Sequence, residues 1–247
     1  MIKDIRALLE GWTYDPGTIS ARWVKGLDGK PKVQLRLDLG LLQMELDGRP
    51  DGRKAGRFET FLARLKDREA KAAPFSAEAG ELSDADLSGL QQEAVQYYYR
   101  YLSFYALKHF DGVIRDTQHN LELIEYVDER VEDDEDAWQF LQFYPYVRMM
   151  NARARAEKAL RAEKFREARD LARQGAEDIY GFWMEQEDME EAENSSEIAI
   201  LNDLIQEIDR RRPVSPEERL KAELDSAIKD ENYEKAAKLR DALRNLG

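Results

Sequence analysis

The chain has 247 residues, 36% of them charged, and a formal net charge of −13. Its length allows one large domain or two modest ones, and its negative charge disfavours nucleic acid as the main partner, because affinity for a polyanion depends on cationic side chains. The absence of cysteine excludes disulfides, thiolate metal sites and cysteine catalysis. The first residues lack the continuous apolar run of a secretion signal, and no segment approaches the ~20 apolar residues that span a bilayer. We therefore expect a cytoplasmic protein without membrane contact.

The first 50 residues show the period-two alternation of β-strands. The alternating apolar positions are Ile19, Ala21, Trp23, Val33, Leu35, Leu37 and Leu39. Asp28 and Gly29 suit the turn between two strands, so we predict an antiparallel hairpin. The parity of the apolar positions switches after Gly40, which we interpret as a bulge. An isolated hairpin is marginal in water, so helices, further strands or a second copy of the chain must cover it, and the last alternative would give a homodimer.

A loop rich in glycine and cations follows at residues 47–56, and its sequence lacks the G-x-x-x-x-G-K-[ST] spacing of a phosphate-binding loop. We interpret it as a solvated connector. The cations that could otherwise reach a phosphate are Arg49, Arg53, Lys54 and Arg57. Residues 57–71 predict a helix through apolar positions three and four apart. These positions are Phe58, Phe61, Leu62 and Leu65.

From Ser83 onward nearly the whole chain predicts helix, and Ser83 with Asp86 resembles a capping box at its start. Aromatic residues are concentrated between positions 97 and 105 and cover more than one helical face, which favours core packing over a ligand site. Two acidic runs, at residues 131–137 and 185–197, predict solvated linkers or helix ends.

A short pattern recurs three times in this helical region. An aromatic residue is followed three positions later by a small apolar one. The pairs are Phe110 with Val113, Phe165 with Ala168, and Tyr233 with Ala236. This pattern indicates helical hairpins in which the ring packs at the turn and the small residue allows close approach. The first two pairs resemble tetratricopeptide-like hairpins, without their W-x-x-L-G pattern.

The last hairpin is predicted from its caps and its apolar stripes. Ser215 would cap the first helix, with Pro216 at its first position and Glu218 completing a capping box, and Asp230 or Asn232 would cap the second. The stripes comprise Leu220, Leu224, Ala227 and Ile228 on one helix and Ala236, Leu239 and Leu243 on the other. Two helices this short need a partner surface.

The segment YEKAAKLRD, residues 233–241, resembles the core of the UVR motif, also called the UvrB/UvrC motif, of the B and C subunits of bacterial excision nuclease. The resemblance is limited to residues 215–247. It implies a helical hairpin that mediates protein association, as in similar hairpins of Clp ATPases and of activators of the bacterial protein arginine kinase. The expected protein-binding residues are Leu224, Ile228, Tyr233, Ala236, Ala237, Arg240 and Asp241.

Catalysis and metal binding have little support in the sequence. His109 and His119 could meet across a turn and bind a metal with Asp111 or Asp116, but they lack a metal-motif spacing, and we favour structural roles. A pocket around Tyr98, His109 and Asp116 is the third alternative. We expect no enzymatic activity, no cofactor and no metal.

The sequence therefore predicts an α+β fold that is mainly α. The expected parts are a β-hairpin and helix region at 1–75, a helical-hairpin domain at 83–212 and the UVR-like hairpin at 215–247. The expected function is an adaptor that recruits a protein partner, such as a Clp-type ATPase, a kinase or a repair subunit. The alternative is a DNA-repair accessory that contacts nucleic acid or the excision nuclease machinery.

Overall fold

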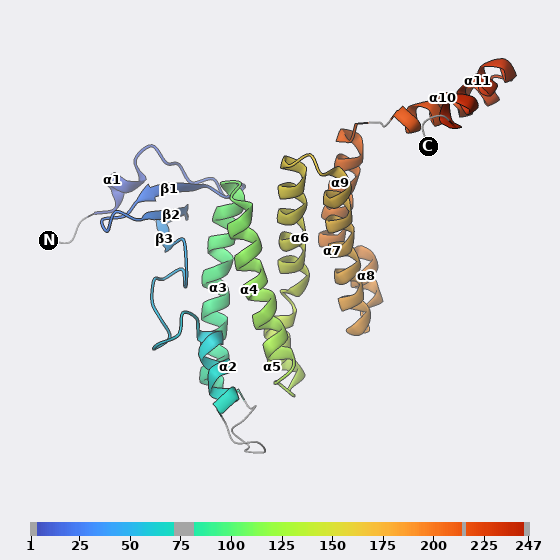
Figure 1. Ribbon diagram of the computed structural model, residues 1–247. Coiled ribbons are helices and arrows are strands. Elements are labelled where there is room, and N and C mark those ends of the chain that lie inside the picture. Colours follow the sequence, from blue (N-terminus) through green and yellow to red (C-terminus); the bar gives the residue numbers. More distant parts are fainter. Residues whose placement is uncertain (1–3, 72–81, 214–215, 245–247) are drawn as a thin grey trace. The chain divides into compact units, whose positions relative to one another are not determined.

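A computed structural model describes residues 4–71, 82–213 and 216–244 (Figure 1). The predicted fold class is confirmed, because a three-stranded antiparallel sheet near the N-terminus is followed by helices and a C-terminal helical pair. The chain divides into two compact units, Met1–Gln206 and Glu207–Gly247. None of the described helices is long and apolar enough to cross a bilayer.

The sheet contains β1 (Ala21–Lys25), β2 (Pro31–Arg36) and β3 (Leu41–Glu45), in that spatial order, and the short helix α1 (Arg6–Leu9) precedes it. The predicted β1–β2 hairpin is confirmed. Its turn is closed by the Gly26 N–H, which donates to the Lys30 carbonyl at 2.7 Å. Gly29 has a φ of +78° there, which glycine adopts without the steric cost of a side chain.

The bulge predicted at Gly40 is wrong. Leu37 and Gly40 exchange backbone hydrogen bonds of 2.9 and 3.3 Å, which close a turn. The chain then reverses, and Leu41 pairs with Arg36 as the third strand begins. The parity of the apolar positions switches because a new strand starts at Leu41.

The apolar face of the sheet packs against helices of the same chain. Val33, Leu35 and Met44 are buried in one cluster with Tyr101 and Phe104. Both rings belong to the C-terminal part of α3 (Asp84–Ala106), beside which the sheet lies in Figure 1. Helical cover and a third strand thus stabilise a hairpin that would be marginal alone.

Two predicted features at the start of the helical region are confirmed. Helix α2 (Phe61–Lys71) buries Leu62 and Leu65, as its periodicity predicted. It begins at Phe61 and not at residue 57, because Phe58 pairs with Ala55 in an isolated bridge before the helix. Ser83 forms the capping box of α3, accepting from the Asp86 N–H while the Asp86 carboxylate accepts from the Ser83 N–H.

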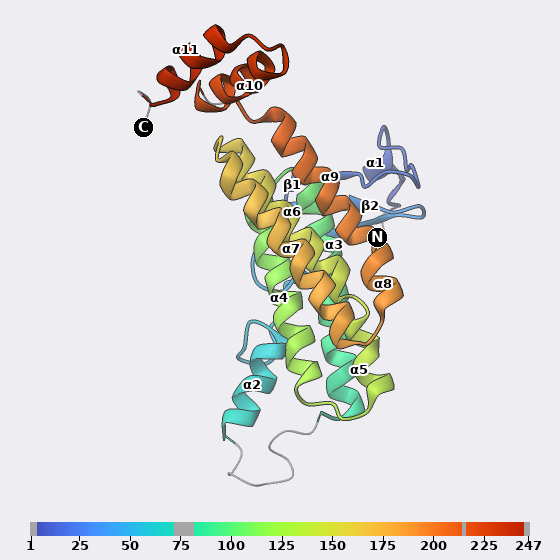
Figure 2. The ribbon, with the colours of Figure 1, turned by 90° about the vertical axis from the view of Figure 1, so that its right-hand side faces the viewer.

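The long helices α3, α4 (Phe110–Asp128), α6 (Tyr144–Arg161) and α7 (Phe165–Glu185) pack in chain order, each against the next (Figures 1 and 2). Three shorter helices accompany them: α5 (Asp134–Leu141), α8 (Met189–Asn194) and α9 (Ser196–Arg211). Both acidic runs supply helix ends, as predicted. Asp133 caps α5 and Asp188 caps α8, where a carboxylate meets the positive end of the helix dipole.

Four helix-to-helix connections share one backbone geometry. A non-glycine residue with positive φ lies two positions before the next helix, and the N–H of the residue after it bonds a carbonyl five residues back, which is the hydrogen bond of a Schellman motif. The positive-φ residues are Lys108, Glu163, Glu187 and Glu231. The connection at Glu187 was not predicted, because Met189 stands where the other three have an aromatic residue.

In each connection the small residue three positions into the new helix is buried. These residues are Val113, Ala168, Ala192 and Ala236. The recurring pattern in the sequence therefore corresponds to a recurring turn, and the small side chain lies where the two helices approach closely.

Candidate protein-interaction site

The C-terminal unit contains the helical hairpin of α10 (Pro216–Lys229) and α11 (Tyr233–Arg244). Its core comprises Ala227, Ala236 and Leu239, with Leu220 and Leu224 packed against them at partial burial. So small a core contributes little free energy of folding, so the hairpin depends on further contacts for stability. Ser215, the predicted cap of α10, lies outside the described residues.

The turn of the hairpin resolves which residue caps α11. Glu231 has a φ of +56°, and the Asn232 N–H donates to the Ala227 carbonyl at 2.8 Å. The Asn232 side-chain oxygen then accepts from the Lys235 N–H at 3.1 Å. Of the two predicted candidates, Asn232 is therefore the cap.

The ring at the start of α11 lies in a different environment from its counterpart in the first unit. Phe110 begins α4 after the same turn and is only 8% exposed. It packs near Tyr105, and the guanidinium of Arg161 lies 4.5 Å from its ring centroid. Tyr233 begins α11 and is 70% exposed. Within its own unit, the hairpin therefore leaves this ring exposed, whereas Tyr105 and Arg161 lie against the ring that begins α4.

Three more residues of α11 lie on the same side of the helix as Tyr233. Residues 233, 237, 240 and 241 are spaced by four, seven and eight positions, which places them on one side of a helix. Ala237 is exposed, and the side chains of Arg240 and Asp241 are each 64% exposed. Their charged groups are 3.6 Å apart, a weak surface pair that leaves both available to another polypeptide.

The structure separates the seven predicted binding residues into two sets. Ala236 is buried in the core and Leu224 is partly buried against it, so these two hold the helices together. The other five are exposed: Ile228, Tyr233, Ala237, Arg240 and Asp241. We refer to these five residues as the hairpin surface. Ile228, which is 51% exposed, lies just before the turn that Tyr233 follows.

The residues of the alternative catalytic pocket have separate environments. The His109 Nδ1 accepts from the Gly112 N–H at 3.1 Å and so caps α4. Asp116 forms a buried ion pair with Arg100. Tyr98 lines an apolar cavity whose lining includes neither His109 nor Asp116.

The second histidine, His119, stacks on Tyr97 with ring centroids 3.9 Å apart, and its Nε2 lies 3.2 Å from a Glu93 oxygen. Within the described ranges, no group of three or more His, Asp or Glu side chains could hold a metal ion. The two histidines thus have structural contacts of different kinds.

Carboxylates already engage three of the four cations in or beside the glycine-rich loop. Arg49 pairs with Asp51 and lies 3.5 Å from Glu93. Lys54 pairs with Glu59 and Arg57 with Asp67. Such pairing reduces the positive charge that this loop can present to a phosphate.

Comparison with known proteins agrees with this geometry. The UvrB/uvrC motif family matches residues 218–247, which include all of α11 and most of α10. No curated protein and no solved structure gives a significant match to the chain. The C-terminal hairpin therefore carries a UvrB/uvrC motif, and the likeness to that family is limited to this hairpin.

Proposed function

We propose that this protein is a non-enzymatic adaptor that recruits a protein partner through the hairpin surface. The observation that carries the proposal is the exposure of Tyr233, because its counterpart Phe110 is covered by side chains of the same chain. Large exposed aromatic residues are typical anchors of protein interfaces. Arg240 and Asp241 beside it supply charges of both signs, which would orient the partner.

The partner that we propose is a Clp-type ATPase, a kinase or a subunit of the excision nuclease. We place the recruitment in the cytoplasm, the setting that a chain without cysteine favours. The alternative, a repair accessory that binds DNA itself, has less support because three of its four candidate cations, Arg49, Lys54 and Arg57, are paired with carboxylates and the net charge is −13. Duplex binding that weakens steeply between low and high salt would favour this alternative.

The test uses the intact chain as bait in affinity capture, followed by binding measurements with each captured protein in purified form. Tyr233→Ala should weaken binding at least tenfold, since aromatic anchors contribute about 2 kcal/mol or more to an interface. Lys235→Ala is the matched control, because Lys235 is also exposed on α11 but lies off the hairpin surface. It should change the affinity less than twofold.

A chain ending at residue 214 provides the second control. If it recovers the same proteins as the intact chain, the adaptor role of the hairpin is contradicted. Equal weakening by Tyr233→Ala and Lys235→Ala would also contradict it.

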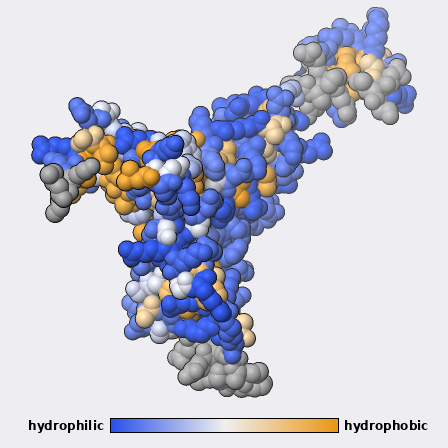
Figure 3. Space-filling view, turned by 60° about the vertical axis from the view of Figure 1, so that its left-hand side comes forward, coloured by the Kyte–Doolittle hydropathy of each residue, from blue (hydrophilic) through white to orange (hydrophobic). Residues whose placement is uncertain are grey.

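Self-association through the N-terminal region is a separate proposal. Figure 3 shows apolar side chains on the surface of this region, and Ile5, Leu8, Ile19 and Trp23 are each more than 40% exposed. The inner face of the sheet is covered by α3, so a dimer would use the apolar side chains that remain exposed. Light scattering of the wild type and of Trp23→Ser at several concentrations tests it, and a concentration-independent monomer would contradict it.

A further inference from the structure

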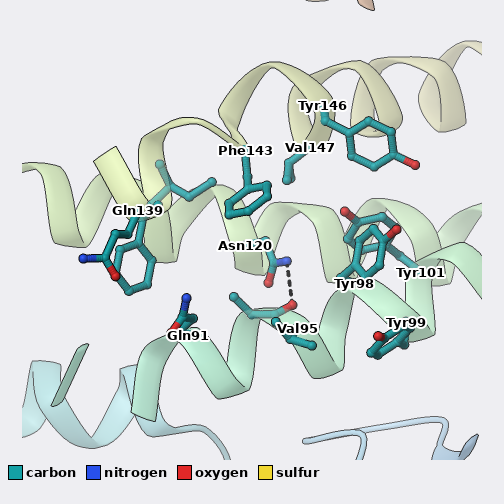
Figure 4. A pocket seen from close by; sticks show the side chains of 13 residues that line it. Gln91, Val95, Tyr98, Tyr99, Tyr101, Asn120, Gln139, Phe143, Tyr146 and Val147 are labelled. Carbon is teal, nitrogen blue, oxygen red and sulfur yellow. Dashed lines mark hydrogen bonds between the residues drawn. The ribbon is translucent and has the colours of Figure 1, made fainter. Parts of the chain in front are cut away.

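A cavity of about 460 Å³ lies in the first unit, and its lining includes no residue of the C-terminal hairpin. Its walls come from α3 and α4, from the end of α5 and the start of α6, and from Phe143 between these two helices (Figure 4). Its volume falls within the range of small-molecule sites, about 300 to 1,000 Å³. No function considered above uses this cavity.

The composition of its walls is unusual for this protein. None of the 13 lining residues is charged, although 36% of the chain is. Six of them are aromatic: Tyr98, Tyr99, Tyr101, Phe140, Phe143 and Tyr146. Burial raises the pKa of Tyr98 and raises that of Tyr146 to about 12, so both rings are neutral at pH 7. A charged ligand would lose its hydration here without gaining an opposite charge, and the site therefore selects neutral molecules.

One buried polar atom of a lining residue has no partner. Asn120 is 4% exposed, and its Nδ2 donates to the Ala94 carbonyl at 3.0 Å. A carbonyl oxygen can only accept, so this bond fixes the orientation of the amide. The Oδ1 is then left buried without a hydrogen bond.

Buried acceptors are rarely left unpaired in folded proteins, and each one calls for an explanation. Figure 4 shows Asn120 between Val95 of α3 and Phe143, which lies between α5 and α6, with the Asn120 amide among the lining side chains. Less than 1 Å² of this oxygen is accessible. A group that donates an N–H or O–H from within the cavity therefore reaches it only with a small shift of the side chains around it, and would then complete its hydrogen bonding.

The cavity is open at a rim that includes Val95 and Phe143, which are 45% and 53% exposed. Tyr101, in contrast, is 1% exposed, so the lining extends into the core. A ligand can therefore enter past the two rim residues and bury most of its surface among aromatic rings, which favour contact with another flat ring.

We propose that this cavity binds a neutral, flat aromatic molecule whose N–H or O–H group donates to Asn120 Oδ1. The aromatic walls favour a ligand with a flat ring, and the absence of charged side chains favours a neutral one. The unpaired oxygen requires that the ligand carry a hydrogen-bond donor. The ligand class is thus that of an indole or a phenol.

Indole and benzothiophene form a matched pair of probes, because a sulfur atom replaces the N–H in a ring system of nearly the same shape. Both would be titrated into the intact chain by calorimetry, with protein NMR to locate the binding. We expect a Kd for indole on the order of 0.1–1 mM, as suits so small a ligand. Benzothiophene should bind about five to ten times more weakly, the effect of one lost hydrogen bond.

Two variants locate the site. Val95→Trp places a large side chain at the half-exposed rim and should abolish indole binding while leaving the fold intact. Tyr180→Ala is the control, because Tyr180 is an exposed aromatic residue of α7 that does not line the cavity. It should leave the Kd unchanged.

A third variant, Asn120→Leu, should remove the preference for indole over benzothiophene. If this variant fails to fold, the preference of the wild type still tests the hydrogen bond. Equal affinity of the wild type for both probes, or indole binding that survives Val95→Trp, would overturn the proposal. Absence of binding at millimolar indole would also overturn it and assign the free oxygen to water alone.

Discussion

Arg100 and Asp116 form a two-fold hydrogen-bonded ion pair in which neither side chain is exposed to solvent. The arginine Nε donates to Oδ2 at 2.6 Å and its Nη2 donates to Oδ1 at 2.8 Å. Its remaining nitrogen, Nη1, donates to the carbonyls of Glu45 and Gly48 at 3.0 and 2.8 Å. One guanidinium therefore joins α3, α4 and the loop that follows β3.

Removing one partner of this ion pair should strongly destabilise the folded protein. We expect Asp116→Ala to lower the free energy of unfolding by about 3–5 kcal/mol, because it leaves a buried guanidinium without its opposite charge. Urea denaturation followed by circular dichroism measures the change. The exposed pair of Arg57 with Asp67 is the control, and Arg57→Ala should cost at most about 1 kcal/mol. Similar losses for the two variants would contradict this account.

Glu93 should make stability depend on pH in the acid range. Its carboxylate accepts from the N–H groups of Phe61 and Leu62 at the start of α2, at 2.6 and 3.1 Å. Burial raises the pKa of Glu93, but hydrogen bonds from His119 and from these two N–H groups outweigh burial and hold the pKa below its usual value. A depressed pKa contributes stability above the unfolded-state pKa of about 4.3, and this contribution is lost as pH falls through the folded-state value.

The measurement compares wild type with Glu93→Gln by urea denaturation at about pH 6 and about pH 3. At about pH 6, wild type should be more stable than Glu93→Gln. At about pH 3, the difference in free energy of unfolding between the two proteins should be smaller. A difference that is constant across this window would show that ionisation of Glu93 does not contribute.

Two glycines of α7 should respond in opposite directions to alanine. A Cβ at Gly175 would lie 2.3 Å from the Ala152 Cβ, whereas a Cβ at Gly181 would have nothing within 4 Å. Gly175→Ala should therefore destabilise the fold by about 1–3 kcal/mol through overpacking against α6. Gly181→Ala should stabilise it by up to about 1 kcal/mol through helix propensity. Thermal or urea unfolding measures both, and the same sign for both would contradict the close approach of α6 and α7.

The connection between α6 and α7 should gain stability from glycine. Glu163 has a φ of +58°, a region in which an L side chain is strained. Glu163→Gly should raise the free energy of unfolding by about 1 kcal/mol. Its neighbour Ala162 has a φ of −90°, so Ala162→Gly should instead lower that energy by about 0.5–1 kcal/mol. Urea denaturation of the two variants tests this contrast.

Local signals in the sequence were sufficient for several elements. Ser83 with Asp86, the turn at Gly29 and the aromatic residues that begin α4, α7 and α11 each act within a few residues of chain, and each is in place. Gly40 was misread because a bulge and a turn produce the same parity switch. Which one occurs is decided by the pairing of Leu41 with Arg36.

The cavity and the buried charges depended on contacts between distant segments. Arg100 and Asp116 are 16 residues apart, and sequence spacing does not show that they meet across two helices. In the sequence, Asn120 is one of several polar residues in a helical stretch, and nothing there shows that it lies among aromatic rings. That environment is formed by other helices and is visible only in the structure. For the hairpin, the sequence identified the motif, but only burial separated Ala236 from Tyr233.

The core of three buried residues that closes α10 on α11 has a consequence for the dynamics of this hairpin. A segment held by so few contacts opens locally at low free energy, so its amide hydrogens should exchange with deuterium far sooner than those of α6 and α7. Occupancy of the hairpin surface would slow that exchange, and deuterium uptake by residues 220–244 would thus report recruitment in the intact protein without an attached probe.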